Sequence, residues 1–138
     1  MAAKIWPETV VIYTDGACRG NPGPSAVGIH VTDIEGNTVD EIGEVLGVQT
    51  NNFAEYTAVK RAFEIAFTQK VKHITLRSDS QLLIRQMLGE YQVKSESIRP
   101  LFMACKKLTR QFQSVQFEHI RRELNQEADR LANLALDS

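Results

Sequence analysis

The chain has 138 residues, of which 43% are hydrophobic and 24% are charged, and its formal net charge at pH 7 is -1. This length predicts one domain, and these proportions are ordinary for a globular protein that buries its own core. The near-neutral charge argues against a protein that binds nucleic acid through its overall charge, so any such binding requires a local patch.

Two cysteines, Cys18 and Cys105, are too few for a disulfide framework, and no spacing of Cys and His predicts a zinc site. The N-terminus lacks the apolar region of a signal peptide, and no stretch approaches the roughly 20 apolar residues of a membrane span. We therefore expect a cytoplasmic protein with free thiols and no membrane contact. It would be a single domain over residues 1–138, with 1–7 as an N-terminal extension.

The first predicted strand, Val10 to Tyr13, leads through Asp15 into a turn rich in glycine and proline. Glycines there allow the backbone to adopt positive φ and to approach a ligand closely. Asp15 is thus expected at the end of a strand, on a rigid edge. The alternative is an Asx-turn, in which the carboxylate bonds only its own backbone.

Residues 26–32 and 38–48 read as two further strands, joined by the turn-forming residues 33–37. Short connections favour antiparallel pairing, so the first three strands form a meander. A wide apolar stripe then predicts a helix over residues 51–68. Asn52 can cap this helix with Glu55 three residues later, so a capping box is the structural alternative for Glu55.

A short strand over residues 73–77 runs into Ser78-Asp79-Ser80 and a helix over 81–88. The alternation of strand and helix implies that this strand pairs parallel to the first. Asp15 and Asp79 would then share the carboxyl edge of the sheet, where open α/β sheets bind ligands. An amphipathic helix beginning near Ile98, with Cys105 on its apolar face, precedes a strand over 115–120.

The last predicted helix follows Asn125, which is expected to cap it, and carries Asp129. Four carboxylates, those of Asp15, Glu55, Asp79 and Asp129, thus stand near element ends. If the fold gathers them, they repel one another unless a cation neutralises them, and hard oxygen ligands suit Mg²⁺ or Mn²⁺. Two such ions can promote in-line displacement at phosphorus, so phosphodiester hydrolysis is the expected chemistry.

The motifs around these acids together resemble the type 1 ribonuclease H family, over about residues 8 to 136. They are Thr14-Asp15-Gly16 through Gly20-Asn21-Pro22-Gly23, then Thr50 to Glu55, Ser78 to Gln81, and Asn125 to Ala132. The resemblance implies an α/β fold with a five-stranded mixed sheet, strand order 3-2-1-4-5, and helices on both faces. It also implies an endonuclease that cuts the RNA strand of RNA/DNA hybrids and leaves 5′-phosphate and 3′-hydroxyl ends. We expect the protein to be a monomer.

By the same resemblance, Asp15 bridges two Mg²⁺ ions, Asp129 holds the ion that activates water, and Glu55 and Asp79 hold the other ion. Mn²⁺ would be a substitute. The resemblance further implies a set of substrate-binding residues: Gly16, Cys18, Asn21, Thr50, Asn51, Asn52 and Gln81. Amides suit minor-groove contacts because they both donate and accept hydrogen bonds, although turn and cap roles are the alternative for Asn52 and Gln81.

The chain departs from many relatives in two places. Only residues 90–96 join two helices where many bacterial members insert a basic protrusion, and the short segment 121–124 replaces a loop that carries a catalytic histidine. His119 is expected within a strand instead. Arg121 and Arg122 are therefore our candidates for contacts with the product phosphate.

Two other functions fit the same motifs. One is a catalytically idle nucleic-acid-binding domain, which the presence of all four acids disfavours because such a domain has no need of a repelling cluster. The other is a nuclease that also acts on double-stranded RNA.

Overall fold

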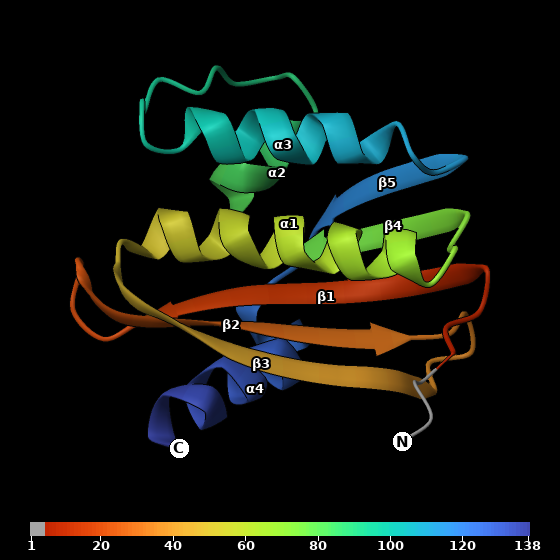
Figure 1. Cartoon of the computed structure of the whole chain (residues 1–138), viewed down its shortest axis with the longest axis horizontal. Helices are drawn as coiled ribbons and strands as arrows, with labels where there is room; N and C mark the ends of the chain where they lie inside the picture. The colour runs from red at the N-terminus through yellow and green to blue at the C-terminus, as the bar shows by residue number, and fades with distance from the viewer. Residues whose placement is uncertain (1–4) are drawn as a thin grey trace.

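The computed structural model describes residues 5–138 as one sheet with helices on both faces (Figure 1). The strands are β1 (Thr9–Cys18), β2 (Gly23–Thr32), β3 (Thr38–Gln49), β4 (His73–Ser78) and β5 (Ser114–His119). The helices are α1 (Asn51–Thr68), α2 (Gln81–Met87), α3 (Arg99–Thr109) and α4 (Gln126–Asp137), with a short 3-10 helix η1 (Arg122–Leu124). None of the helices within this range is long and apolar enough to cross a membrane.

The sheet has the order β3-β2-β1-β4-β5, as the family resemblance implied. β1, β2 and β3 form the predicted antiparallel meander, whereas β4 pairs parallel to both β1 and β5. In the β1–β4 ladder, Thr14 lies opposite Ser78. The residue after each of these two is an aspartate, so the register brings Asp15 and Asp79 to the same edge of the sheet.

β1 is longer than the sequence predicted. Its pairing with β4 stops at Thr14, but its pairing with β2 continues to Cys18, which lies opposite Ser25. Asp15 therefore lies inside a strand, opposite Gly28, and both the predicted strand end and the Asx-turn alternative are wrong. The second strand's hydrogen bonds keep the backbone extended beyond the point where the parallel neighbour ends.

The main core lies between the sheet and the helices α1, α2 and α3. Its largest fully buried side chains include Tyr56 and Phe63 of α1, together with Ile12 and Leu76 of the neighbouring strands β1 and β4. Cys105 is fully buried in the same cluster, which confirms its predicted packing role.

Trp6 packs into this core although it precedes the first strand. It is 3% exposed, and its indole Nε1 donates a hydrogen bond of 3.0 Å to Asp40 Oδ2 of β3. Its backbone N–H donates to Gln69 Oε1 at the end of α1. Part of the predicted extension 1–7 is thus integrated into the fold, while residues 1–4 lie outside the described range.

Two predicted helix caps differ in the structure. Thr50, not Asn52, caps α1, because the Thr50 hydroxyl accepts the Phe53 N–H at 3.2 Å. The capping box proposed for Glu55 is therefore wrong, because with Thr50 as the cap a capping box needs its acid at Phe53, two positions before Glu55. Asn125 occupies the cap position of α4, but its side chain makes no capping hydrogen bond.

Glycine 28 allows α4 to lie directly on β2. A Cβ at Gly28 would lie 1.9 Å from the carbonyl oxygen of Ala128, so any larger residue must displace the helix that carries Asp129. We expect Gly28→Ala to lower the free energy of unfolding by about 1–3 kcal/mol, which urea denaturation would measure.

Gly36→Asn is the matched control, because Gly36 has a φ of +89° and no atom within 4 Å of its Cβ position. Asn tolerates positive φ better than most residues, so this change should cost less than about 1 kcal/mol. An unchanged denaturation midpoint for Gly28→Ala would show that α4 is not held against β2 by this contact.

Candidate active site

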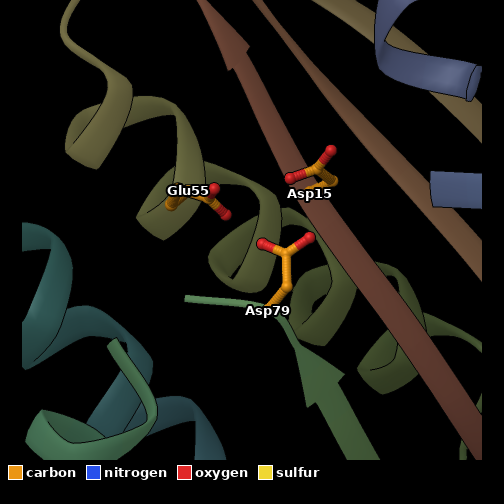
Figure 2. Close-up of side chains that lie close together, drawn as sticks. All are labelled: Asp15, Glu55 and Asp79. Atoms are coloured by element: carbon orange, nitrogen blue, oxygen red, sulfur yellow. The ribbon is translucent and has the colours of Figure 1, made fainter. Parts of the chain in front are cut away.

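Three carboxylates converge at the carboxyl edge of the sheet. Figure 2 shows Asp15 of β1, Glu55 of α1 and Asp79, which follows β4, pointing toward one another. One oxygen of each lies within 4.8 Å of an oxygen of the other two. These residues are 40 and 24 positions apart in the chain, so only the sheet register and the packing of α1 on β1 bring them together.

Close backbone packing at Gly16 brings Glu55 to the strand. A Cβ at Gly16 would lie 2.4 Å from the backbone nitrogen of Glu55, so α1 could not approach β1 this closely with a larger residue there. The Gly16 N–H also donates a 3.2 Å hydrogen bond to Glu55 Oε2. Gly16 therefore orients a carboxylate, in addition to lining the cavity in front of it.

The fourth acid, Asp129, lies in the first turn of α4 and lines the same cavity of about 380 Å³. Its negative charge is among the causes that raise the pKa of Asp15. Asn133, one turn later, donates from Nδ2 to Asp129 Oδ1 at 3.3 Å. The cavity is lined by Asp15, Gly16, Ala17, Cys18, Arg19, Asn51, Glu55, Asp79, Arg122, Asp129 and Asn133.

Burial and repulsion make Asp15 and Glu55 hard to ionise without a cation. Burial first, and then the charges of Glu55 and Asp79, raise the pKa of Asp15 to about 9. Burial and the charge of Asp79 raise the pKa of Glu55 to about 8, although the Gly16 N–H and Arg122 oppose this shift. A divalent cation would reverse both effects, and an all-oxygen donor set of this kind fits a hard cation.

The predicted substrate-binding residues fall into two groups. Gly16, Cys18 and Asn51 line the acidic cavity, and Asn21 accepts the Asn51 N–H at 3.0 Å through Oδ1, so it lies at the cavity's rim. Thr50 is the preceding residue and uses its hydroxyl to cap α1. These contacts hold the β1–β2 turn against the start of α1.

Asn52 and Gln81 lie apart from the residues that line the acidic cavity. Asn52, in the first turn of α1, lines a separate groove near Tyr91 and Gln92. Gln81 is exposed at the first residue of α2, whose cap is Ser80. Both side chains are available to a partner that extends beyond the acids.

The two arginines proposed for product binding differ in position. Arg122 lines the acidic cavity and its charge acts on Glu55. Arg121 is exposed, precedes η1, and lies outside the residues that line the cavity. His119 is the last residue of β5, as the sequence predicted, and is exposed.

The sequence analysis did not assign three residues of the site to it. Asn125 donates from Nδ2 to Asp79 Oδ2, Asn133 contacts Asp129, and Arg19 lines the cavity while its Nη2 pairs with Asp137 Oδ1 at 2.7 Å. A spacing of four residues on either side of Asp129 was the available signal for the two asparagines. Nothing in the local sequence places Arg19 beside the C-terminal end of α4.

A five-stranded mixed sheet in this order, with acids from β1, α1, β4 and α4 at one edge, defines the ribonuclease H-like class of proteins. The family described as "Reverse transcriptase-like" matches residues 13–135. The chain is 41% identical to ribonuclease HI of Halobacterium salinarum in an alignment 140 positions long, which covers 99% of this chain and 70% of that protein. The crystal structure of ribonuclease H1 from that archaeon superposes with a TM-score of 0.91 over 94% of this chain and 98% of that one.

Two further relatives point to the same family. LC11-RNase H1, solved in complex with an RNA/DNA hybrid, is 40% identical and superposes with a TM-score of 0.88 over 94% of this chain and 97% of that one. A bifunctional protein of Mycobacterium tuberculosis is 36% identical over 94% of this chain, which spans only 36% of that protein. The chain belongs to the type 1 ribonuclease H family, and the predicted fold and enzyme class are confirmed.

Removing one of the buried carboxylates that repel one another should raise the stability of the fold. Asp15 has a folded-state pKa of about 9 against an ordinary value of 3.8, so its carboxyl group stabilises the fold below pH 4 and loses that contribution as pH rises toward 9. Asn stays neutral throughout. Without metal, we expect Asp15→Asn to raise stability by at least about 1 kcal/mol, roughly 3–5 °C in Tm, at pH 8 and to have little such effect at pH 4.

Thermal unfolding in EDTA at pH 4, 6 and 8 measures this difference. Asp33→Asn is a control, because Asp33 is not among the residues that line the acidic cavity, and hydrogen bonds from Asn37 and Glu35 lower its pKa. Replacement of Asp33 should lower, rather than raise, the stability of the protein at pH 8. A gain for Asp15→Asn that is equal at all three pH values would rule out charge repulsion as its cause.

Proposed function

We propose that this chain is a metal-dependent endoribonuclease that cleaves the RNA strand of RNA/DNA hybrids to 5′-phosphate and 3′-hydroxyl products. The observation that carries the proposal is the convergence of Asp15, Glu55 and Asp79 within 4.8 Å, with Asp129 in the same cavity. Clustered carboxylates repel one another and so destabilise the fold. Such a cluster is expected where it binds a cation that acts on a phosphodiester. The relative LC11-RNase H1, crystallised with an RNA/DNA hybrid, supports the substrate.

Mg²⁺ is the proposed cofactor, with two ions per site in the presence of substrate and Mn²⁺ as a substitute. Asp15, Glu55, Asp79 and Asp129 would hold the ions. When bound, such ions supply Lewis acidity at the phosphate and lower the pKa of water. The four side chains are thus both the proposed metal ligands and the proposed catalytic residues.

The proposed substrate contacts are Gly16, Cys18, Asn21, Thr50, Asn51, Asn52 and Gln81. The Asn51 N–H donates a hydrogen bond to Asn21 Oδ1, so the two residues lie side by side near the cavity. Their amides can bind a 2′-hydroxyl or a base edge without selecting a sequence. Arg19 and Arg122 supply positive charge from opposite ends of α4 and suit flanking or product phosphates.

We further propose that residues 1–138 act as one monomeric domain in the cytoplasm. All four acids come from a single chain, so the proposed site needs no second copy. Both cysteines are free thiols, one buried and one near the cavity, which suits a reducing compartment.

Cleavage of an internally labelled RNA/DNA hybrid tests the proposed function. In Mg²⁺ we expect cuts within the RNA strand only, and a loss of activity of at least about a thousandfold for Asp15→Asn with its fold intact. Matched duplexes of RNA and of DNA, incubated in parallel, test the alternatives.

Cutting of double-stranded RNA at a comparable rate would support the broader nuclease. Binding of the hybrid without cleavage in either metal would support an idle binding domain. Substantial activity of Asp15→Asn would show that the acids are not the catalytic centre.

Arg122 should assist turnover because it lines the cavity, whereas Arg121 and His119 do not. An arginine can bind a new 5′-phosphate through two hydrogen bonds, but it does not exchange protons near neutral pH. We expect Arg122→Ala to lower kcat about tenfold, or ~1.4 kcal/mol of barrier, with a loss of the same size from pH 6 to 9. Arg121→Ala and His119→Ala are the controls.

Steady-state rates of the three variants over that pH range measure the effect. A large, pH-dependent loss for His119→Ala, with Arg122→Ala near wild type, would transfer the role to the histidine.

A further inference from the structure

Asn125 is a buried amide at the point where three parts of the site meet. It is 1% exposed, and its Nδ2 donates to the carbonyl oxygen of Thr14 at 2.9 Å and to Asp79 Oδ2 at 3.3 Å. Thr14 immediately precedes Asp15 in β1. The Asn125 side chain therefore contacts both β1, which carries Asp15, and the carboxylate of Asp79.

The orientation of this amide follows from its surroundings. Both groups that face Nδ2 are hydrogen-bond acceptors, so a flipped amide would place Oδ1 against a carbonyl and a carboxylate. In the observed orientation Oδ1 is buried and accepts no hydrogen bond from the residues that the structure describes. An unpaired buried acceptor costs about 1–3 kcal/mol. The two hydrogen bonds made by Nδ2 are therefore formed even though Oδ1 is left unpaired.

The backbone of Asn125 extends the connection to the remaining groups of the site. Its N–H donates to the Arg122 carbonyl oxygen at 3.0 Å, and its own carbonyl oxygen accepts the Asp129 N–H at 3.2 Å. Asn125 thus sets the position of η1 behind it and of the first turn of α4 ahead of it. Although Asn is a favoured helix cap, the side chain is directed to β1 and Asp79 instead.

We propose that Asn125 is a positioning residue that fixes the Asp79 carboxylate, and the start of α4 with Asp129, relative to Asp15 for metal binding. The inference rests on the proposed function for its consequence in catalysis, but its contacts stand without it. A neutral amide suits the role, because it orients Asp79 without cancelling the negative charge that a cation requires. Groups that orient metal ligands in this way typically change metal affinity 10- to 100-fold when removed.

Manganese binding in the absence of nucleic acid tests the proposal directly. We expect Asn125→Ala to weaken the affinity for Mn²⁺, measured by calorimetry, about tenfold or more. In hybrid cleavage, kcat should fall, KM for the hybrid should stay within about twofold, and added Mn²⁺ should restore part of the rate. A loss of stability alone would produce none of these three results.

Gln86→Ala is the matched control. Gln86 is also a buried amide, 6% exposed, but it contacts Tyr56 and the Gln92 carbonyl and does not line the acidic cavity. Its removal should lower Tm and leave the Mn²⁺ affinity unchanged. Asn125→Ser is the second variant, because Ser is a favoured cap that supports the start of α4 but is too short to reach both Thr14 and Asp79.

The outcomes separate the two proposals. Wild-type affinity for Mn²⁺ in a folded Asn125→Ala or Asn125→Ser protein would overturn the positioning role. If Asn125→Ala does not fold, Asn125→Ser decides the question. Manganese binding by the wild-type protein without cleavage of any hybrid would refute the proposed function, while the affinities of the variants would still test Asn125.

Discussion

The burial of like charges at the edge of the sheet is the constraint on which the rest of this structure depends. Asp15 and Glu55 are each only 5% exposed, and they lie close to each other and to Asp79. Without a cation, both burial and repulsion oppose ionisation, which is why the pKa values of Asp15 and Glu55 lie far above those of free carboxyl groups. The fold therefore stores unfavourable free energy in the one place where a divalent cation would release it.

Two glycines and one asparagine show how the chain holds that arrangement. Gly16 lets α1 approach β1 and donates a hydrogen bond to Glu55, and Gly28 lets α4 rest on β2. Asn125 then joins α4 to β1 and to Asp79. Each contact uses a small or neutral group, so the acids are oriented by backbone approach and amide donors rather than by salt bridges that would compete with a metal.

The positive charge of the site is placed at its margins. Arg122 approaches from η1 and Arg19 from the β1–β2 turn, where Asp137 pairs with it. This division suits phosphodiester chemistry, since cations at the acids would be redundant with metal ions, whereas cations at the margin can bind phosphates that flank the reacting one.

The succession of strands and helices along the chain and the parallel pairing of β1 with β4 could be predicted from hydrophobic periodicity, whereas the order of the strands in the sheet came from the family resemblance. Local motifs singled out the four acids that we propose as the catalytic residues. The length of β1 could not be predicted, since its last residues stay extended only through hydrogen bonds to β2. Likewise, Thr50 rather than Asn52 caps α1, and Asn125 bonds Thr14 and Asp79 rather than its own helix. Local sequence describes which hydrogen bonds a side chain can make with its neighbours in the chain, and only tertiary packing decides whether a group 111 residues away competes for the same donor.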